Sequence, residues 1–240
     1  MKSLIKPLAT LTCIILLNNL TTKAASAMPD TTFIPDSNNK NIVNMEVRGT
    51  NGELVLIGKL ISGRKEGLFR TYAETTAIRS VQEFHNGNPH GIKLVFGDNG
   101  WLEFEENYND GQLEGRRIIY RFGGIRKSVE NYSGGKLNGT RTSFYENGFK
   151  QEESNFKNGM REGISKWYNQ SEQIIIQYTY KEGKLNGPGS TYHQNAKLES
   201  EGNYKNDVED GEWKMYDENG TLVKTVYYKD GKVTKEIIAK

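Results

Sequence analysis

The stretch Asn131-Tyr-Ser-Gly-Gly-Lys-Leu-Asn-Gly-Thr-Arg-Thr-Ser-Phe-Tyr-Glu-Asn-Gly148 contains the whole unit from which this chain is built. It starts with an aromatic residue, Tyr132, that leads into a glycine-rich turn. A short run typical of a strand then carries Phe144, and a second turn follows at the final Asn-Gly pair. Nearly everything from about residue 43 onward is a copy of this cycle, so its fold decides the fold of the chain.

The copies recur with a constant 24-residue period, which is the step from Tyr108 to Tyr132. A first aromatic series occupies Phe84, Tyr108, Tyr132, Phe156, Tyr180, Tyr204 and Tyr228. A second one occupies Tyr72, Phe96, Tyr120, Phe144, Tyr168, Tyr192 and Tyr216. Three glycine series keep the same register, and their departures are Thr76, Glu172, Ala196 and Asp207. A fixed period of this kind indicates a repeat architecture in which each unit contacts its neighbours.

The N-terminal segment has the features of a cleavable secretory leader. Residues 1–27 combine a basic start with a short apolar run, Leu8 to Leu17, and end in the small-x-small pattern Ala25-Ser26-Ala27. An uncleaved anchor is the alternative. We interpret 28–42 as a flexible lead-in and 43–240 as a single repeat domain.

Charge and cysteine content limit the classes of partner. The leader contributes three lysines, so its removal leaves 29 basic against 30 acidic residues of the original 32 and 30. A nearly neutral chain gives no support for nucleic-acid binding by bulk charge. The only cysteine, Cys13, lies in the leader, so no disulfide is expected in the mature chain.

Each repeat offers two extended runs separated by turns, which predicts an all-β fold: an elongated antiparallel array of β-hairpins, preceded by a signal peptide. Asn-Gly pairs such as 147–148 and 219–220 supply the positive φ angles of tight hairpin turns. We expect one face to carry the aromatic ladder, with each ring beside a phased glycine that leaves it room. The other face should be polar, as in a sheet that is wet on one side.

At these residues the chain resembles the MORN repeat, specifically the bacterial variant found in YwqK-type antitoxin proteins. The matching pieces are Tyr132 to Gly139, Tyr180 to Gly187 and Gly211 to Gly220, and the resemblance covers about 43–231. It implies a β-hairpin array used for protein contact, with some eukaryotic relatives linked to membrane lipid. A secretory leader departs from the cytoplasmic setting usual for such antitoxins.

No residue pattern is typical of a catalytic or metal site, so we expect no enzyme and no cofactor. The three histidines, His85, His90 and His193, lack ligand spacing and have no cysteine partners. Adjacent carboxylates such as Glu105 and Glu106 point to opposite faces of a strand, which suits solvated charges better than a catalytic pair.

Four aromatic residues outside the two series are the candidate binding surface. They are Trp167, Trp213, Tyr145 and Tyr227. By alternation, Trp167 and Trp213 lie on the face opposite Tyr168 and Tyr216, and aromatic side chains on a wet face are enriched at recognition surfaces. The alternative is that a second layer or a curl of the sheet covers them.

These observations predict a non-enzymatic, exported bacterial repeat protein, located in the periplasm, on the outer surface or in the medium. It would act as a scaffold for an unidentified protein partner or a component of the cell envelope. One alternative is an immunity protein that neutralises a partner toxin. Another is a module that binds lipid headgroups or carbohydrate, with peripheral membrane contact.

Overall fold

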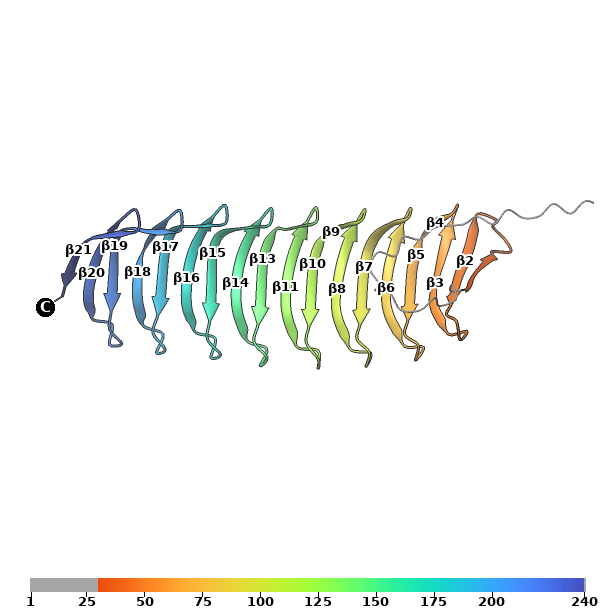
Figure 1. Ribbon diagram of the computed structural model, residues 1–240, viewed down its shortest axis with the longest axis horizontal. Helices are drawn as coiled ribbons and strands as arrows, with labels where there is room; N and C mark the ends of the chain where they lie inside the picture. The colour runs from red at the N-terminus through yellow and green to blue at the C-terminus, as the bar shows by residue number, and fades with distance from the viewer. Residues whose placement is uncertain (1–29, 240) are drawn as a thin grey trace, which may run out of the picture.

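The computed structural model describes residues 30–239, which form one open antiparallel sheet of 21 strands that follow one another as a meander. The sheet is a long ribbon with its strands across the long axis (Figure 1). The all-β prediction is confirmed, and the described residues contain no helix, hence none that could cross a lipid bilayer. The predicted leader, residues 1–27, lies outside the described part.

The strands follow the 24-residue period. Their bounds are β1 Asp30–Pro35, β2 Ile42–Arg48, β3 Leu54–Ile61, β4 Arg64–Lys65, β5 Gly67–Tyr72, β6 Ile78–His85, β7 Asn88–Phe96, β8 Leu102–Asn109, β9 Gln112–Leu113, β10 Gly115–Tyr120, β11 Arg126–Ser133, β12 Lys136–Leu137, β13 Gly139–Phe144, β14 Lys150–Lys157, β15 Met160–Tyr168, β16 Ile174–Lys181, β17 Lys184–Tyr192, β18 Leu198–Lys205, β19 Val208–Tyr216, β20 Leu222–Lys229 and β21 Lys232–Ile238. Within 28–42, where the sequence predicts a flexible lead-in, β1 pairs with β2.

One row of turns consists of two-residue hairpin loops. In each of these loops both residues have positive φ, as in Asn158 (52°) and Gly159 (86°), which is the geometry of a type I′ turn. The turns also couple neighbouring repeats, because the second loop residue donates its backbone N–H to a carbonyl that lies just after the corresponding turn of the preceding repeat. Gly135 donates to Leu113 at 2.9 Å and Gly159 donates to Leu137 at 2.8 Å.

The Asn-Gly pairs lie in the opposite row, where the loops are longer. There only the glycine is left-handed, as in Gly148 (φ 86°), and its N–H bonds to the carbonyl three residues earlier. Of each predicted Asn-Gly pair, the glycine thus supplies the positive φ angle of the turn and the asparagine does not. The departures from the glycine series keep the same conformation, with φ of 66° at Thr76, 61° at Glu172 and 63° at Ala196.

The two aromatic series lie on opposite faces of the sheet. We call the face that carries Tyr204 and Trp213 the inner face, because most of the buried side chains lie on it. The second series lies on the other side, the outer face, where the Tyr216 hydroxyl donates to Glu201 at 2.8 Å. The prediction of a single aromatic face is therefore wrong, because the register across each turn, which sequence spacing does not fix, sets the relative face of the two series.

The phased glycines serve backbone conformation rather than ring packing. Gly115, Gly163 and Gly211 all have positive φ, and a Cβ placed on any of them would meet nothing within 4 Å. The glycines that lie under rings are outside the phased series: a Cβ on Gly58 or Gly202 would lie 2.2 Å from the ring of Phe69 or Trp213.

The left-handed threonine yields a stability prediction. Thr76 is β-branched at a position where φ is 66°, so Thr76→Gly should raise the free energy of unfolding by about 1 kcal/mol. The matched control is Gly148→Thr, three repeats further on, which should lower it by a similar amount. Urea unfolding followed by circular dichroism measures both, and a destabilised Thr76→Gly variant would contradict this assignment of strain.

Candidate binding surfaces

The four aromatic residues singled out from the sequence do not form one surface. Trp213 is 5% exposed, and its ring lies between Tyr204 and Tyr228 with centroids 5.0 and 6.4 Å away. Its indole N–H donates to the Asn203 carbonyl at 3.1 Å. Trp213 and Tyr216 lie on opposite faces of β19, as alternation predicts. Trp213 is on the buried face, however, so the prediction that it forms part of a binding surface is wrong.

The other three residues are half-buried at separate places. Trp167 lies on the inner face, with its ring 6.0 Å from that of Tyr178 and 5.5 Å from the Arg161 guanidinium. Tyr145 bridges two loops, because its hydroxyl donates to the Tyr168 carbonyl at 2.6 Å. Tyr227 lies on β20 beside the ammonium of Lys235.

A ladder of ion pairs runs along the middle of the inner face. Lys93 and Arg117 flank Glu106, with charged atoms 3.5 and 2.8 Å from its carboxylate. Arg117 and Arg141 flank Glu130 in the same way, at 3.5 and 3.3 Å. The series continues through Glu152, which pairs with Arg141 at 3.9 Å and also with Arg161. Charges thus alternate from β7 to β15.

Hydroxyl groups complete the coordination of these carboxylates. The Tyr108 hydroxyl donates to Glu106 at 2.8 Å, and the Tyr132 hydroxyl donates to Glu130 at 2.9 Å. Burial together with this hydrogen bond raises the pKa of Tyr108 to about 12, and the same causes raise the pKa of Tyr132. The side chain of Glu130 is only 8% exposed, so these partners replace the water that its carboxylate would otherwise contact.

Sequence reasoning missed this ladder, although a signal for it exists. Lys93, Arg117 and Arg141 lie in successive repeats, at the repeat position that Phe69 and Trp213 occupy elsewhere. Aligning the copies at their period shows basic residues in one column. Because charged strand residues are usually solvated, such a column does not by itself indicate burial.

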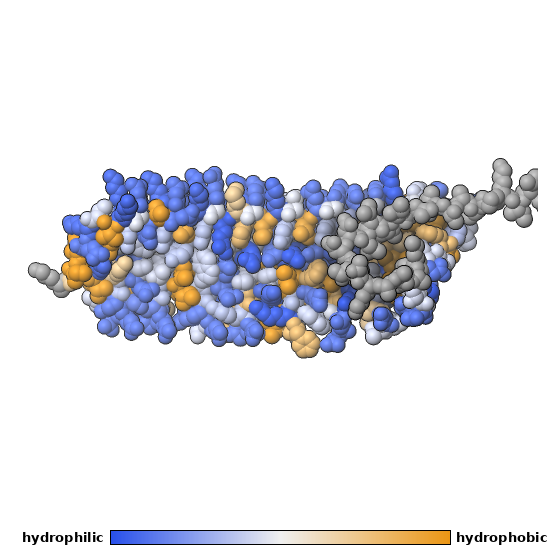
Figure 2. Space-filling view, viewed as in Figure 1, coloured by the Kyte–Doolittle hydropathy of each residue, from blue (hydrophilic) through white to orange (hydrophobic). Residues whose placement is uncertain are grey.

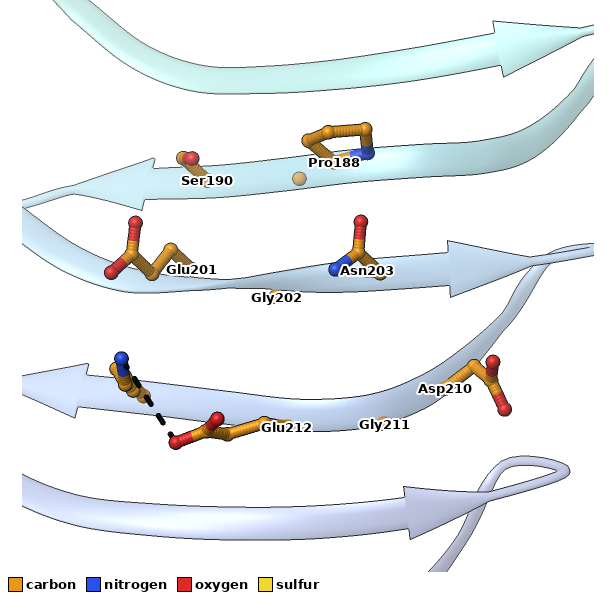
Figure 3. Close-up of a pocket in the computed structure, with 10 residues that line it drawn as sticks. Pro188, Ser190, Glu201, Gly202, Asn203, Asp210, Gly211 and Glu212 are labelled. Atoms are coloured by element: carbon orange, nitrogen blue, oxygen red, sulfur yellow. Dashed lines mark ion pairs between the residues drawn. The ribbon is translucent and has the colours of Figure 1, made fainter.

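The outer face carries two hollows at equivalent positions six repeats apart. The one near the C-terminal end has a volume of about 550 Å³ and is polar, with side chains such as Ser190, Glu201 and Glu212 from three adjacent strands on its walls (Figure 3). The one near the N-terminal end has about 280 Å³ and is lined by Ile57 and Leu68, the counterparts of Glu201 and Glu212. The same backbone therefore presents different chemistry at its two ends.

The histidines are spread over the structure. His85 lies 3.0 Å from a carboxylate oxygen of Glu66, and its ring centroid is 5.7 Å from that of His90. His193 contacts the Tyr216 carbonyl at 2.9 Å. Among residues 30–239 there is no group of three His, Cys, Asp or Glu side chains that could hold a metal ion.

Comparison with known families agrees with this architecture. Five segments match the family model described as MORN repeat variant, at residues 89–110, 137–158, 161–182, 185–206 and 209–230. These five segments are MORN repeats. Each matched MORN segment begins just after one type I′ turn, continues through a strand, a long loop and the next strand, and ends at the first residue of the following type I′ turn. No curated protein matches the chain.

The buried carboxylate gives a prediction for the ladder. Glu130→Gln leaves Arg117 and Arg141 without their shared counter-ion, so the free energy of unfolding should fall by about 3 kcal/mol. The control is Glu212→Gln, which removes an exposed partner of Lys214 and should cost less than about 1 kcal/mol. Equal losses in urea unfolding would show that the ladder is not an integrated buried network.

The tyrosines give a pH prediction. The folded pKa of Tyr108 is about 12 against an unfolded value near 10, so folding favours the neutral phenol. That stabilisation is complete below pH 10 and is lost as the pH rises from 10 toward 12. Unfolding measured across this range should show falling stability, with a shallower fall in Tyr108→Phe. An identical slope in both proteins would contradict the proposed coupling.

Proposed function

We propose that this chain is an exported, non-enzymatic MORN-repeat scaffold that binds a protein partner of the cell envelope through the outer face of its N-terminal half. MORN repeats commonly serve as binding or scaffold modules. We choose this surface because the outer face of the N-terminal half exposes apolar side chains. Export rests on the leader-like sequence of residues 1–27.

The apolar surface follows one column of the repeat. Leu68 is 41% exposed and Ile92 is 37% exposed, one repeat apart on β5 and β7. Half-buried Ile57, Val81 and Leu94 lie on the adjoining outer-face positions of neighbouring strands. In the C-terminal half the counterparts of Leu68 and Ile57 are Glu212 and Glu201 six repeats on. Ile164, in the same column as Leu68, is also exposed (45%), but Glu153 stands there in place of Ile57, so the cluster of apolar residues is confined to the N-terminal half.

The surroundings of this surface favour a protein as the partner. Glu46, Lys59 and Arg70 line the N-terminal hollow together with Ile57 and Leu68. An apolar centre with charged groups around it is the usual anatomy of a protein interface. The backbone of these paired strands is already ordered, so binding a partner does not have to fix it, which favours affinity.

The surface is tested by site-specific photo-crosslinking in the native cell. A photoreactive residue replaces Leu68 in one strain and Glu212, at the equivalent position six repeats on, in another. We expect one defined protein adduct at position 68 and none at 212. The substitution Ile92→Glu, combined with the probe at 68, should abolish the adduct.

The results that would contradict the proposal are equally specific. The same adducts at positions 68 and 212, or an adduct at 68 that survives Ile92→Glu, would exclude a local apolar interface. Absence of any adduct at 68 would exclude the surface altogether. Recovery of the chain only in the cytoplasmic fraction would contradict export.

A further inference from the structure

The two outermost strands of the described sheet, β1 and β21, each have one side that pairs with no described strand. Every residue of both strands is exposed. The apolar side chains are prominent: Phe33 is 52% exposed on β1, and Ile238 is 67% exposed on β21, with Ile34 and Ile237 also exposed beside them. The C-terminal end of the ribbon shows an apolar patch on its surface (Figure 2). Unpaired edges of this kind are templates for pairing with another chain.

Backbone hydrogen bonds show which groups point outward. The Ala239 N–H donates to Val223 on β20, and the Asp36 N–H donates to Ile42 on β2. Because successive residues of an antiparallel strand direct their N–H and C=O groups to opposite sides, Ile238 and Glu236 point away from β20. Phe33 and Thr31 point away from β2 by the same alternation.

The pairing register between neighbouring strands inside the sheet shows how the two edge strands would pair with each other. Ile238 lies opposite Lys224, just as Met215 lies opposite Ser200 one repeat earlier. Thr31 lies opposite Val47, again as Ser200 lies opposite Met215. Ile238 thus occupies the place of Met215, and Thr31 the place of Ser200 and of its repeat counterpart Lys224. Between β19 and β20, Met215 pairs with Lys224. If the sheet continues from β21 to β1 in the same way, Ile238 lies opposite Thr31.

We propose that β21 of one copy of this chain pairs antiparallel with β1 of a second copy, in this register, so that copies assemble head to tail. Ile238 and Thr31 then form a hydrogen-bonded pair, as do Glu236 and Phe33, which matches the outward-pointing groups of both edges. The sheet continues without a change of strand direction.

Side chains are complementary in the same register. Ile238 becomes the diagonal neighbour of Phe33 on the inner face, and Ile237 that of Ile34 on the outer face. Lys235 becomes the diagonal neighbour of Asp36, a pair of opposite charges. Diagonal neighbours across antiparallel strands lie within reach of large side chains. The chain would bury its most exposed apolar edge residues in this way.

The geometry also fixes the type of assembly. The two edges are different surfaces, so the contact is heterologous and leaves one free edge at each end of any oligomer. Such a contact forms open filaments rather than closed dimers. Because the interface is only one strand wide, we expect weak association, so the size of the oligomers should depend on protein concentration.

Proline variants test the proposal without disturbing internal pairing. Glu236→Pro removes an outward-pointing N–H from the β21 edge, and Phe33→Pro removes one from the β1 edge. Sedimentation velocity of the unmodified chain, measured up to high micromolar concentration, should show multiples of the monomer mass (27.2 kDa for all 240 residues) that grow with concentration. Each variant alone should stay monomeric, because one of its edges is blocked.

An equimolar mixture of the two proline variants should stop at a dimer, since one variant supplies β1 and the other supplies β21. Circular dichroism verifies that both variants are folded. A monomeric unmodified chain at every concentration would overturn the proposal, and so would oligomers that persist in either variant alone.

Disulfide trapping gives a test that does not depend on proline. In a Cys13→Ser background, Thr32→Cys and Ile237→Cys place cysteines directly opposite each other in a non-hydrogen-bonded pair, where Cα atoms lie about 4.5 Å apart. Oxidation should yield a ladder of covalent multimers. The control pair Thr32→Cys with Val233→Cys is offset by four residues, roughly 13 Å along the strand, and should yield none. Equal multimers from both pairs, or none from the first, would exclude this register.

Discussion

The backbone hydrogen bond between each type I′ turn and the preceding repeat is the interaction on which the ribbon depends. Seven turns make it, from Gly87 to Lys65 through Gly231 to Glu209, with N···O distances of 2.8 to 3.1 Å. This hydrogen bond forms only if both residues of the two-residue loop have positive φ. It also needs successive turns to be spaced by one repeat period along the chain. The regular period and the phased glycines both follow from that requirement. Glu182 and Asp207 show that a non-glycine residue can meet it at a cost in strain.

With the backbone spacing fixed, the inner face can be filled in two ways. Near both ends of the ribbon, rings cover glycines or small residues, as Phe69 covers Gly58 and Trp213 covers Gly202. In the middle, the ladder around Glu106 and Glu130 fills the same columns with alternating charges. A ring over glycine gains stability from apolar burial, whereas the ladder balances the desolvation of each charge against two partners. Such a ladder is a specific arrangement, because each charge needs its neighbours on both adjacent hairpins.

The sequence predicts the architecture because its period is a backbone requirement. The aromatic and glycine series were enough to derive an antiparallel hairpin array, since residues such as Gly87 and Tyr132 recur wherever a turn or strand recurs. The surfaces were less predictable. Trp213 has the spacing of an exposed aromatic residue, and only the register across the turn, with its bulge between Glu201 and Asn203, shows that it is buried. Neither spacing nor composition distinguishes the buried Glu130 from the solvated carboxylates around it.

The coupling between turns is measured most directly by amide hydrogen exchange on protein labelled with ¹⁵N-glycine. We predict that the N–H groups of Gly111, Gly135 and Gly159 exchange as slowly as amides inside the strands, because each one is bonded to the preceding repeat. Gly123, an exposed glycine in the opposite row of loops, should exchange rapidly. Exchange of the turn glycines at the rate of Gly123 would contradict the claim that these turns join the repeats into one structure.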